Sequence, residues 1–207
     1  MLSMCSRVAV RVLRAVLVLC LAGPVVAAEG DIERGRVLAD TCEGCHAVDS
    51  YTNVYPTYRV PRIGGQSTEY LVEALTLYRN GDRAHDTMAA QAASYSDQDI
   101  QDIAAYLASA VPPLTAGEPK GSAPEAAAVC ASCHGAAGIG AIVSYPYLAG
   151  QHKDYLLQAL SQYKNGERKG INATVMQAQL QMLTEQDLEA VASFYAAQTG
   201  LQSLPRD

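Results

Sequence analysis

The chain is built from two copies of one sequence pattern. Cys42-Glu43-Gly44-Cys45-His46 returns 88 positions later as Cys130-Ala131-Ser132-Cys133-His134, and Tyr78-Arg79-Asn80-Gly81-Asp82-Arg83 returns 85 positions later as Tyr163-Lys164-Asn165-Gly166-Glu167-Arg168. The shift is 88 again at Met88 and Met176, so each half has three extra residues in a different loop. A tandem duplication restricts the chain to two similar domains. Each copy holds roughly 80 residues, a size at which an unaided hydrophobic core is marginal.

Composition marks the boundaries of the two copies. The segment 111–124 contains four prolines and two glycines and has no helical period, which is typical of a linker. We therefore expect one domain over residues 29–111, a linker over residues 112–123, and a second domain over residues 124–204.

Residues 1–28 have the three regions of a secretory signal peptide. Arg7, Arg11 and Arg14 form a basic start, an apolar run covers residues 15–22, and small residues precede Glu29. The apolar run is short for a membrane span, so we expect export to the periplasm with cleavage near Ala28. An uncleaved anchor and lipid attachment at Cys20 are the alternatives.

Cleavage leaves a strongly acidic chain. The first 28 residues carry three of the 15 basic residues and none of the 21 acidic ones, so the mature chain has 12 against 21 and a formal charge of −9. Nucleic-acid binding needs clustered Lys and Arg, so no nucleic-acid partner is expected.

Apolar residues recur at spacings of three and four, which predicts an all-α fold. Ser67 is placed to cap a helix that Gly81 ends. Ser96 to Asp99 and Thr184 to Asp187 approximate capping boxes, and each opens a further helix. A shorter helix is expected to begin each half, from Asp31 into Cys42 and from Pro124 into Cys130. No segment alternates well enough to predict a strand.

The repeated Cys-x-x-Cys-His motif is the attachment signature of c-type haem. Two thiols on one helical turn form thioethers to both vinyl groups of one porphyrin, and the adjacent histidine is held beneath the iron. Zinc binding would join motifs 88 positions apart and leave both histidines unexplained. A redox dithiol needs a βαβ setting that this sequence lacks. We therefore predict two covalently bound haem c groups, with Cys42, Cys45, Cys130 and Cys133 as thioether donors and His46 and His134 as iron ligands.

Two such units in one exported chain resemble class I cytochromes c and, together, the dihaem cytochrome c₄ family. The resemblance implies two tandem class I cytochrome c domains, each wrapped around one haem. It also implies respiratory redox partners, such as a membrane-bound quinol-oxidising complex and a terminal oxidase. Peripheral association with the membrane is left open.

The sixth iron ligands are expected to be methionines. Met88 follows His46 by 42 residues, and Met176 follows His134 by the same interval. In the resembling family the distal ligand is likewise a Met shortly before the last helix, and a thioether raises the reduction potential. The alternatives are that these methionines only fill the core, or that Met182 or His85 replaces one of them.

The resemblance also suggests roles for two prolines. In that family a Pro carbonyl accepts the N–H of the proximal imidazole, which fixes the ring, and Pro61 and Pro146 occupy that place. His152, which follows a Gly-Gln turn, is expected to face solvent, and His85 is expected to have a surface role. Tyr106 and Phe194, which align in the last helix of each half, are expected to pack near the haem edge or the opening helix.

The first half has a tyrosine-rich loop over residues 51–59 that the second half lacks. We expect Tyr51, Tyr55 and Tyr58 to cover the haem or to bond its propionates, with Arg59 or Arg62 as the charge partner.

The favoured function is one-electron transfer without substrate chemistry, because two six-coordinate haems leave no open site. The alternative is a dihaem enzyme or enzyme subunit, such as a peroxidase or the cytochrome subunit of a sulfur-oxidising dehydrogenase. Gas sensing would require an output domain, and the sequence supplies none.

Overall fold

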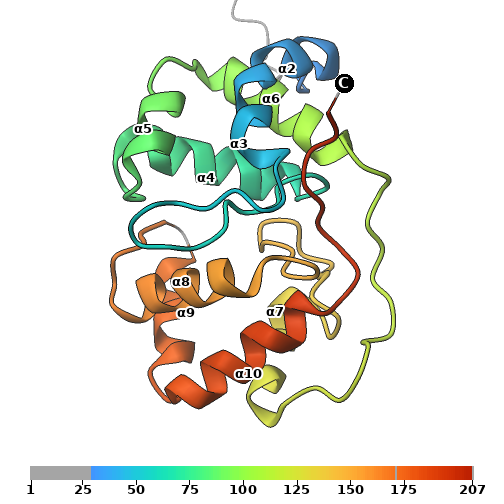
Figure 1. Ribbon diagram of the computed structural model, residues 1–207, viewed down its shortest axis with the longest axis vertical. Coiled ribbons are helices and arrows are strands. Elements are labelled where there is room, and N and C mark those ends of the chain that lie inside the picture. Colours follow the sequence, from blue (N-terminus) through green and yellow to red (C-terminus); the bar gives the residue numbers. More distant parts are fainter. Residues whose placement is uncertain (1–28, 171, 207) are drawn as a thin grey trace, which may run out of the picture.

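The computed structural model describes residues 29–170 and 172–206, so the expected signal peptide lies outside the described residues. Two helical halves are stacked, with the linker along one side and the C-terminal segment returning to the first half (Figure 1). Within the described ranges the extended pairing consists of two isolated bridges, Thr52 with Arg59 and Gly64 with Gln202. The predicted all-α fold is confirmed. No helix in this part of the chain is long and apolar enough to cross a membrane.

The same series of helices occurs in both halves. The first half contains α2 (Ile32–Leu38), α3 (Asp40–His46), α4 (Thr68–Asn80), α5 (Asp86–Ala92) and α6 (Asp97–Ser109). The second half contains the 3₁₀ turn η1 (Glu125–Ala127), α7 (Ala128–His134), α8 (Lys153–Lys164), α9 (Ala173–Leu180) and α10 (Glu185–Ala196). The tandem duplication seen in the sequence is therefore a duplication of structure.

The helix ends follow local side-chain chemistry. Ser67 caps α4 by accepting from the backbone N–H of Tyr70, and Gly81 ends it with a φ of 77°, the left-handed region that glycine enters without strain. Both expected capping boxes form, at the starts of α6 and α10. The predicted caps are confirmed.

Two features were not expected. Each opening segment is broken in two, at Ala39 in the first half and after η1 in the second. The short helices α5 and α9 are also new. Seven or eight residues hold about two turns, too few for an apolar stripe to establish a period.

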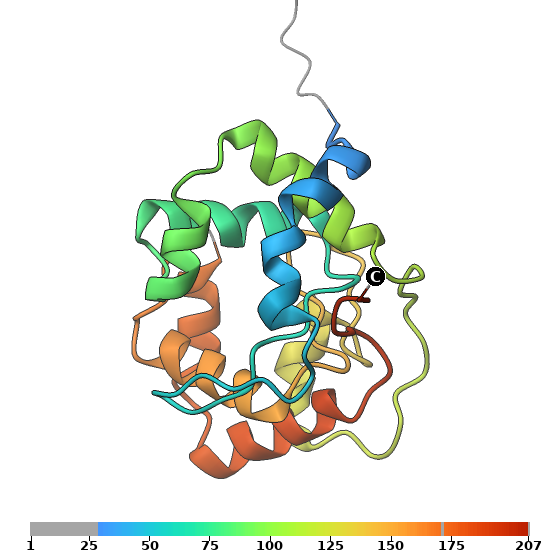
Figure 2. The same ribbon diagram turned by 45° about the horizontal axis from the view of Figure 1, so that its top comes forward.

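The core of the first half lies where α2, α4 and α6 meet (Figure 2). Gly35 lets the backbone of α2 lie directly against α6, because a Cβ atom built there would be 1.9 Å from the carbonyl oxygen of Asp102. Arg34 forms ion pairs with Asp99 and Asp102, and the backbone N–H of Asp31 donates to Asp102 at 2.8 Å. These polar contacts fix the crossing of the two helices.

The C-terminal segment belongs to the packing of the first half. Gly64 and Gln202 exchange two backbone hydrogen bonds of 3.0 and 3.2 Å, and the N–H of Leu204 donates to the carbonyl of His46 at 3.0 Å. Leu204 is buried in the first core. The tail thus fastens the second half to the segment that carries His46.

Candidate functional site

The candidate site is a cavity of about 870 Å³ that both halves line. The predicted haem-attachment cysteines and iron ligands of both halves all lie on its wall: Cys42, Cys45, His46, Met88, Cys130, Cys133, His134 and Met176. Its size is at the upper end of the range for small-molecule and cofactor sites. The fold therefore brings two equivalent sets of four side chains into one continuous space.

The cysteines lie on two short helices, α3 and α7, that each end at the histidine of the motif. No disulfide joins any two of them, and all four are partly buried. Burial raises the pKa of Cys42 to about 11 and also raises the pKa of Cys130. These thiols are protonated at neutral pH, unlike the low-pKa thiolates of redox dithiols.

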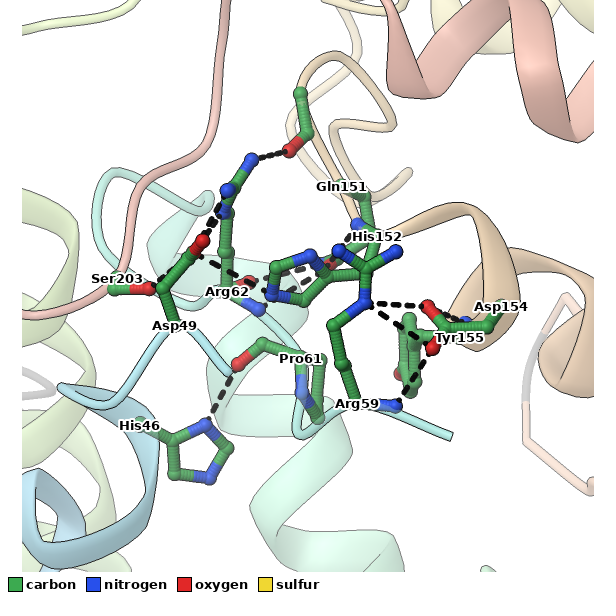
Figure 3. Close-up of polar contacts among 11 residues, drawn as sticks. His46, Asp49, Arg59, Pro61, Arg62, Gln151, His152, Asp154, Tyr155 and Ser203 are labelled. Carbon is green, nitrogen blue, oxygen red and sulfur yellow. Dashed lines mark hydrogen bonds and ion pairs between the residues drawn. The ribbon is translucent and has the colours of Figure 1, made fainter. Parts of the chain in front are cut away.

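Each histidine ring is oriented by one proline carbonyl. The Nδ1 of His46 lies 2.7 Å from the carbonyl oxygen of Pro61 (Figure 3), and the Nδ1 of His134 lies 2.9 Å from that of Pro146. Burial lowers the pKa of both imidazoles, against the opposing effect of these bonds. A neutral ring that donates from Nδ1 keeps the Nε2 lone pair for a metal ion.

The methionines lie on the two unexpected helices, Met88 on α5 and Met176 on α9, and both are half-buried. His85 does not extend freely into solvent; its Nδ1 accepts from the backbone N–H of Met88 at 3.3 Å and so caps α5. Met182 is 88% exposed and does not line the cavity. The cavity wall therefore holds one methionine from each half.

The three tyrosines of the loop over residues 51–59 differ widely in exposure. Tyr55 is 95% exposed and Tyr51 is half exposed, whereas Tyr58 is 7% exposed and packs against Tyr155 of the second half at 6.1 Å between ring centroids. All three line the cavity. Arg59 and Arg62 are each engaged by a carboxylate, Asp154 and Asp49 respectively (Figure 3).

The two halves meet through a reciprocal pair of glutamines. Gln66 accepts from the N–H of Tyr147 at 2.8 Å and donates to its carbonyl at 3.1 Å. Gln151, its counterpart, accepts from the N–H of Arg62 at 2.9 Å and donates to its carbonyl at 2.8 Å. Both amides are buried, and each is paired with the backbone of the other half, which fixes how the two halves meet.

His152 lies in this interface, and the expectation that it faces solvent is wrong. The side chain is 2–3% exposed, and its Nε2 is 3.6 Å from Asp49 (Figure 3). Burial, followed by the charges of Arg62 and Arg59, lowers its pKa. The reason is tertiary: His152 is equivalent to Ser67, which is also buried and contacts Val143 of the other half.

Comparison with known proteins identifies the family. The cytochrome c family model matches twice, over residues 32–110 and 120–197. Cytochrome c₄ of Pseudomonas aeruginosa is 31% identical, over 81% of this chain and 88% of that protein.

The chain belongs to the cytochrome c family, in its dihaem cytochrome c₄ group. The crystal structure of reduced cytochrome c₄ from Pseudomonas stutzeri superposes with a TM-score of 0.65 at 26% identity, covering 82% of this chain and 99% of that one. The thiosulfate dehydrogenase electron acceptor of Stutzerimonas stutzeri is 28% identical, over 76% of this chain and 79% of that protein. The resemblance inferred from the motifs is confirmed.

Membership in this group means two covalently bound haem c groups and an electron-carrying role. The cavity fits them: it holds two Cys-x-x-Cys helices and two imidazoles whose Nδ1 atoms are already engaged. The predicted cofactors are confirmed.

Sequence reasoning missed two residues of this cytochrome c₄ cavity. Arg83 and Arg168 are buried on its wall, and they occupy equivalent places in the repeated Tyr-x-Asn-Gly-x-Arg segment. The sequence contained a signal for them, because an arginine at the same position in both copies of the repeat indicates a role common to both halves.

Proposed function

We propose that this dihaem cytochrome is a periplasmic carrier that passes single electrons between respiratory redox partners. In this role the electron donor would be a membrane-bound quinol-oxidising complex, and the electron acceptor would be a terminal oxidase. The formal charge of −9 after residue 28 favours basic docking surfaces on those partners. Residues 1–28 would direct export, and the domains would be 29–111 and 124–204 with the linker 112–123.

The site assignment under this proposal follows the two sets of cavity residues. Cys42 and Cys45 would hold one haem, with His46 and Met88 as axial ligands. In the second half, Cys130 and Cys133 would hold the other haem, with His134 and Met176 as axial ligands. The observation that carries the proposal is that each half supplies both a histidine and a methionine to the cavity, which leaves neither iron an open position for a substrate.

The protein's residues serve electron transfer by limiting rearrangement. When bound, the haem iron alternates between the ferrous and ferric states. The carbonyls of Pro61 and Pro146, which bond the imidazole Nδ1 atoms, would hold each ring at one angle in both states. A neutral thioether favours ferrous over ferric iron and keeps the reduction potential high.

The assignment is tested by ligand replacement. Met88→His and Met176→His should each lower the reduction potential of one haem and leave the other unchanged, because imidazole stabilises ferric iron better than a thioether does. Met182→His is the matched control, since Met182 is exposed and outside the cavity. Potentiometric titration followed in the visible spectrum measures both haems, and unchanged potentials in either ligand variant reject the assignment for that half.

A second candidate is the electron-accepting subunit of a sulfur-oxidising dehydrogenase, which the thiosulfate dehydrogenase electron acceptor among the relatives favours. The two roles differ in the donor. Reduction of the purified protein by a quinol-oxidising complex but not by a thiosulfate dehydrogenase supports the respiratory carrier; the reverse preference supports the subunit. Peroxide turnover, with loss of the methionine–iron charge-transfer band in one haem, would indicate a dihaem peroxidase instead.

A further inference from the structure

Two arginine side chains are buried in the cavity without a carboxylate partner. Arg83 is 6% exposed and Arg168 is 8% exposed. Within residues 29–170 and 172–206 no Asp or Glu forms an ion pair with either guanidinium. By contrast Arg59 and Arg62, at the same interface, are each paired with an aspartate. The buried arginines therefore differ from their neighbours in lacking a compensating anion.

Tyrosines surround Arg83 in place of acids. Its guanidinium lies over the ring of Tyr78, 4.5 Å from the centroid. Nη2 donates to the hydroxyl of Tyr155 in the other half at 2.7 Å, and Nη1 donates to that of Tyr70 at 3.3 Å. Nε is buried and has no hydrogen-bond partner. Arg83 thus reaches across the interface and still has an unused donor.

Arg168 approaches the same hydroxyl from its own half. Its Nη2 is 3.5 Å from the hydroxyl oxygen of Tyr155, Nε donates to Gln162 at 2.8 Å, and the guanidinium lies 5.2 Å from the centroid of Tyr163. The two guanidinium groups therefore converge on one neutral oxygen. All of the arginines and tyrosines of this cluster line the cavity: Tyr58, Tyr70, Tyr78, Arg83, Tyr155, Tyr163 and Arg168.

This arrangement is unfavourable unless an anion joins it. A buried charge without a partner is strongly destabilising because its lost hydration is not replaced, and two cations at one site also repel each other. Burial alone would raise the pKa of Tyr155, yet the field of Arg83 and Arg168 lowers it to about 8. Tyrosine hydroxyls and ring faces compensate only partly for a buried guanidinium, so the site is electrostatically incomplete.

The two haems that belong in this cavity would bring anions with them, namely their propionate carboxylates. Each haem c has two propionate groups, and a guanidinium is the side chain best matched to a carboxylate in shape and charge. We propose that Arg83 and Arg168 form a shared cationic site that binds propionate carboxylates of both haems at the domain interface, and that this site sets the potential of each haem. The inference rests on the two-haem assignment and is independent of the choice of redox partners.

The physical consequence is a link between protonation and potential. A cation beside a carboxylate lowers its pKa by about 1–3 units, so the arginines keep the propionates ionised throughout the range near neutral pH. Without one arginine, a propionate would take up a proton within that range. The haem potential would then fall as the pH rises, because the negative charge of an ionised propionate stabilises the ferric state relative to the ferrous state.

The test uses the full two-haem protein with Arg83→Gln and Arg168→Gln. Arg79→Gln is the matched control, because Arg79 is in the same half and pairs with Asp97 outside the cavity. Potentiometric titrations at several values between pH 5 and 8 should show nearly flat potentials for the wild type and the control. In the two test variants a pH-dependent step should enter this range, displaced by about 1–3 pH units from its position in the wild type. Arg83→Gln should alter both haems, since Arg83 contacts both halves.

Potentials of both test variants that match those of Arg79→Gln at every pH overturn the proposal. If the glutamine variants fail to retain two haems, ¹³C NMR of the wild type with labelled propionates decides the question. Carboxyl resonances that titrate at least about one unit below an exposed carboxylate support the arginine site, and ordinary titration refutes it. Neither result depends on electron exchange with a partner, so a failure here is distinguishable from a failure of the carrier assignment.

Discussion

Gly35→Ala should weaken the first half through a single methyl group. At Gly35 the helices α2 and α6 touch backbone to backbone, and an added Cβ would lie 1.9 Å from the carbonyl oxygen of Asp102 and 3.0 Å from the Cβ of Tyr106. The obstructing atom belongs to the backbone of a helix, so no side-chain rotation relieves the clash. The two helices must separate, and the contacts of Asp102 with Arg34 and Asp31 must lengthen.

The magnitude follows from two opposing terms. Overpacking typically costs about 1–3 kcal/mol, and a rigid backbone contact this short belongs at the upper end of that range. Alanine recovers about 1 kcal/mol through its higher helix propensity. The expected net loss is about 2 kcal/mol, which lowers the melting temperature by about 4–16 °C, the smaller shift applying if both halves unfold together.

Gly44→Ala is the matched control, because Gly44 is also helical and a Cβ there meets nothing within 4 Å. It should be neutral or stabilising by up to about 1 kcal/mol. Guanidinium unfolding followed by circular dichroism compares the two variants, with the visible spectrum confirming that both haems are attached. If Gly35→Ala proves as stable as Gly44→Ala, the close helix crossing is not a feature of the folded protein.

Two further predictions concern the contacts between the halves. Leu204→Ala should destabilise the first half by about 2–5 kcal/mol, because it empties a buried position supplied by the tail; equal guanidinium midpoints for this variant and the wild type would contradict that packing. His152 has a pKa below its ordinary value of 6.5 in the folded chain, so its contribution to stability is complete above that pH and is lost as the pH falls. Unfolding measured from pH 8 to 5 should therefore show a steeper loss in the wild type than in His152→Gln, and identical slopes would refute the buried, neutral histidine.

The features that could be predicted from the sequence depend on neighbours in the chain. The two haem motifs specify their chemistry within five residues, and the capping boxes, such as Ser96 with Asp99, form between residues three apart. The start, the buried stripe and the end of the helix between Ser67 and Gly81 are likewise determined by residues within that segment. Such signals need no knowledge of the rest of the fold.

The features that were missed depend on the other half. His152 is a polar residue that follows a turn, which is typical of an exposed position. Its burial is decided by the domain that packs over it. Leu204 comes after the last helix, where nothing local indicates that the chain returns to the carbonyl of His46. The ion pairs of Arg59 with Asp154 and of Arg62 with Asp49 likewise join residues that the sequence alone does not place near each other.

The interface explains how a duplicated sequence can make a cavity that neither copy makes alone. Positions 62 and 66 correspond to positions 147 and 151 at the constant shift of 85, and each glutamine bonds the backbone at the position equivalent to the one that the other bonds. Such reciprocity is the mark of an isologous contact, in which one surface serves both partners. Since the same symmetry relates Arg83 to Arg168, one arginine per copy becomes a pair at the junction. A pair of buried cations at the junction is therefore a direct consequence of duplicating a domain that has a buried arginine beside its contact surface.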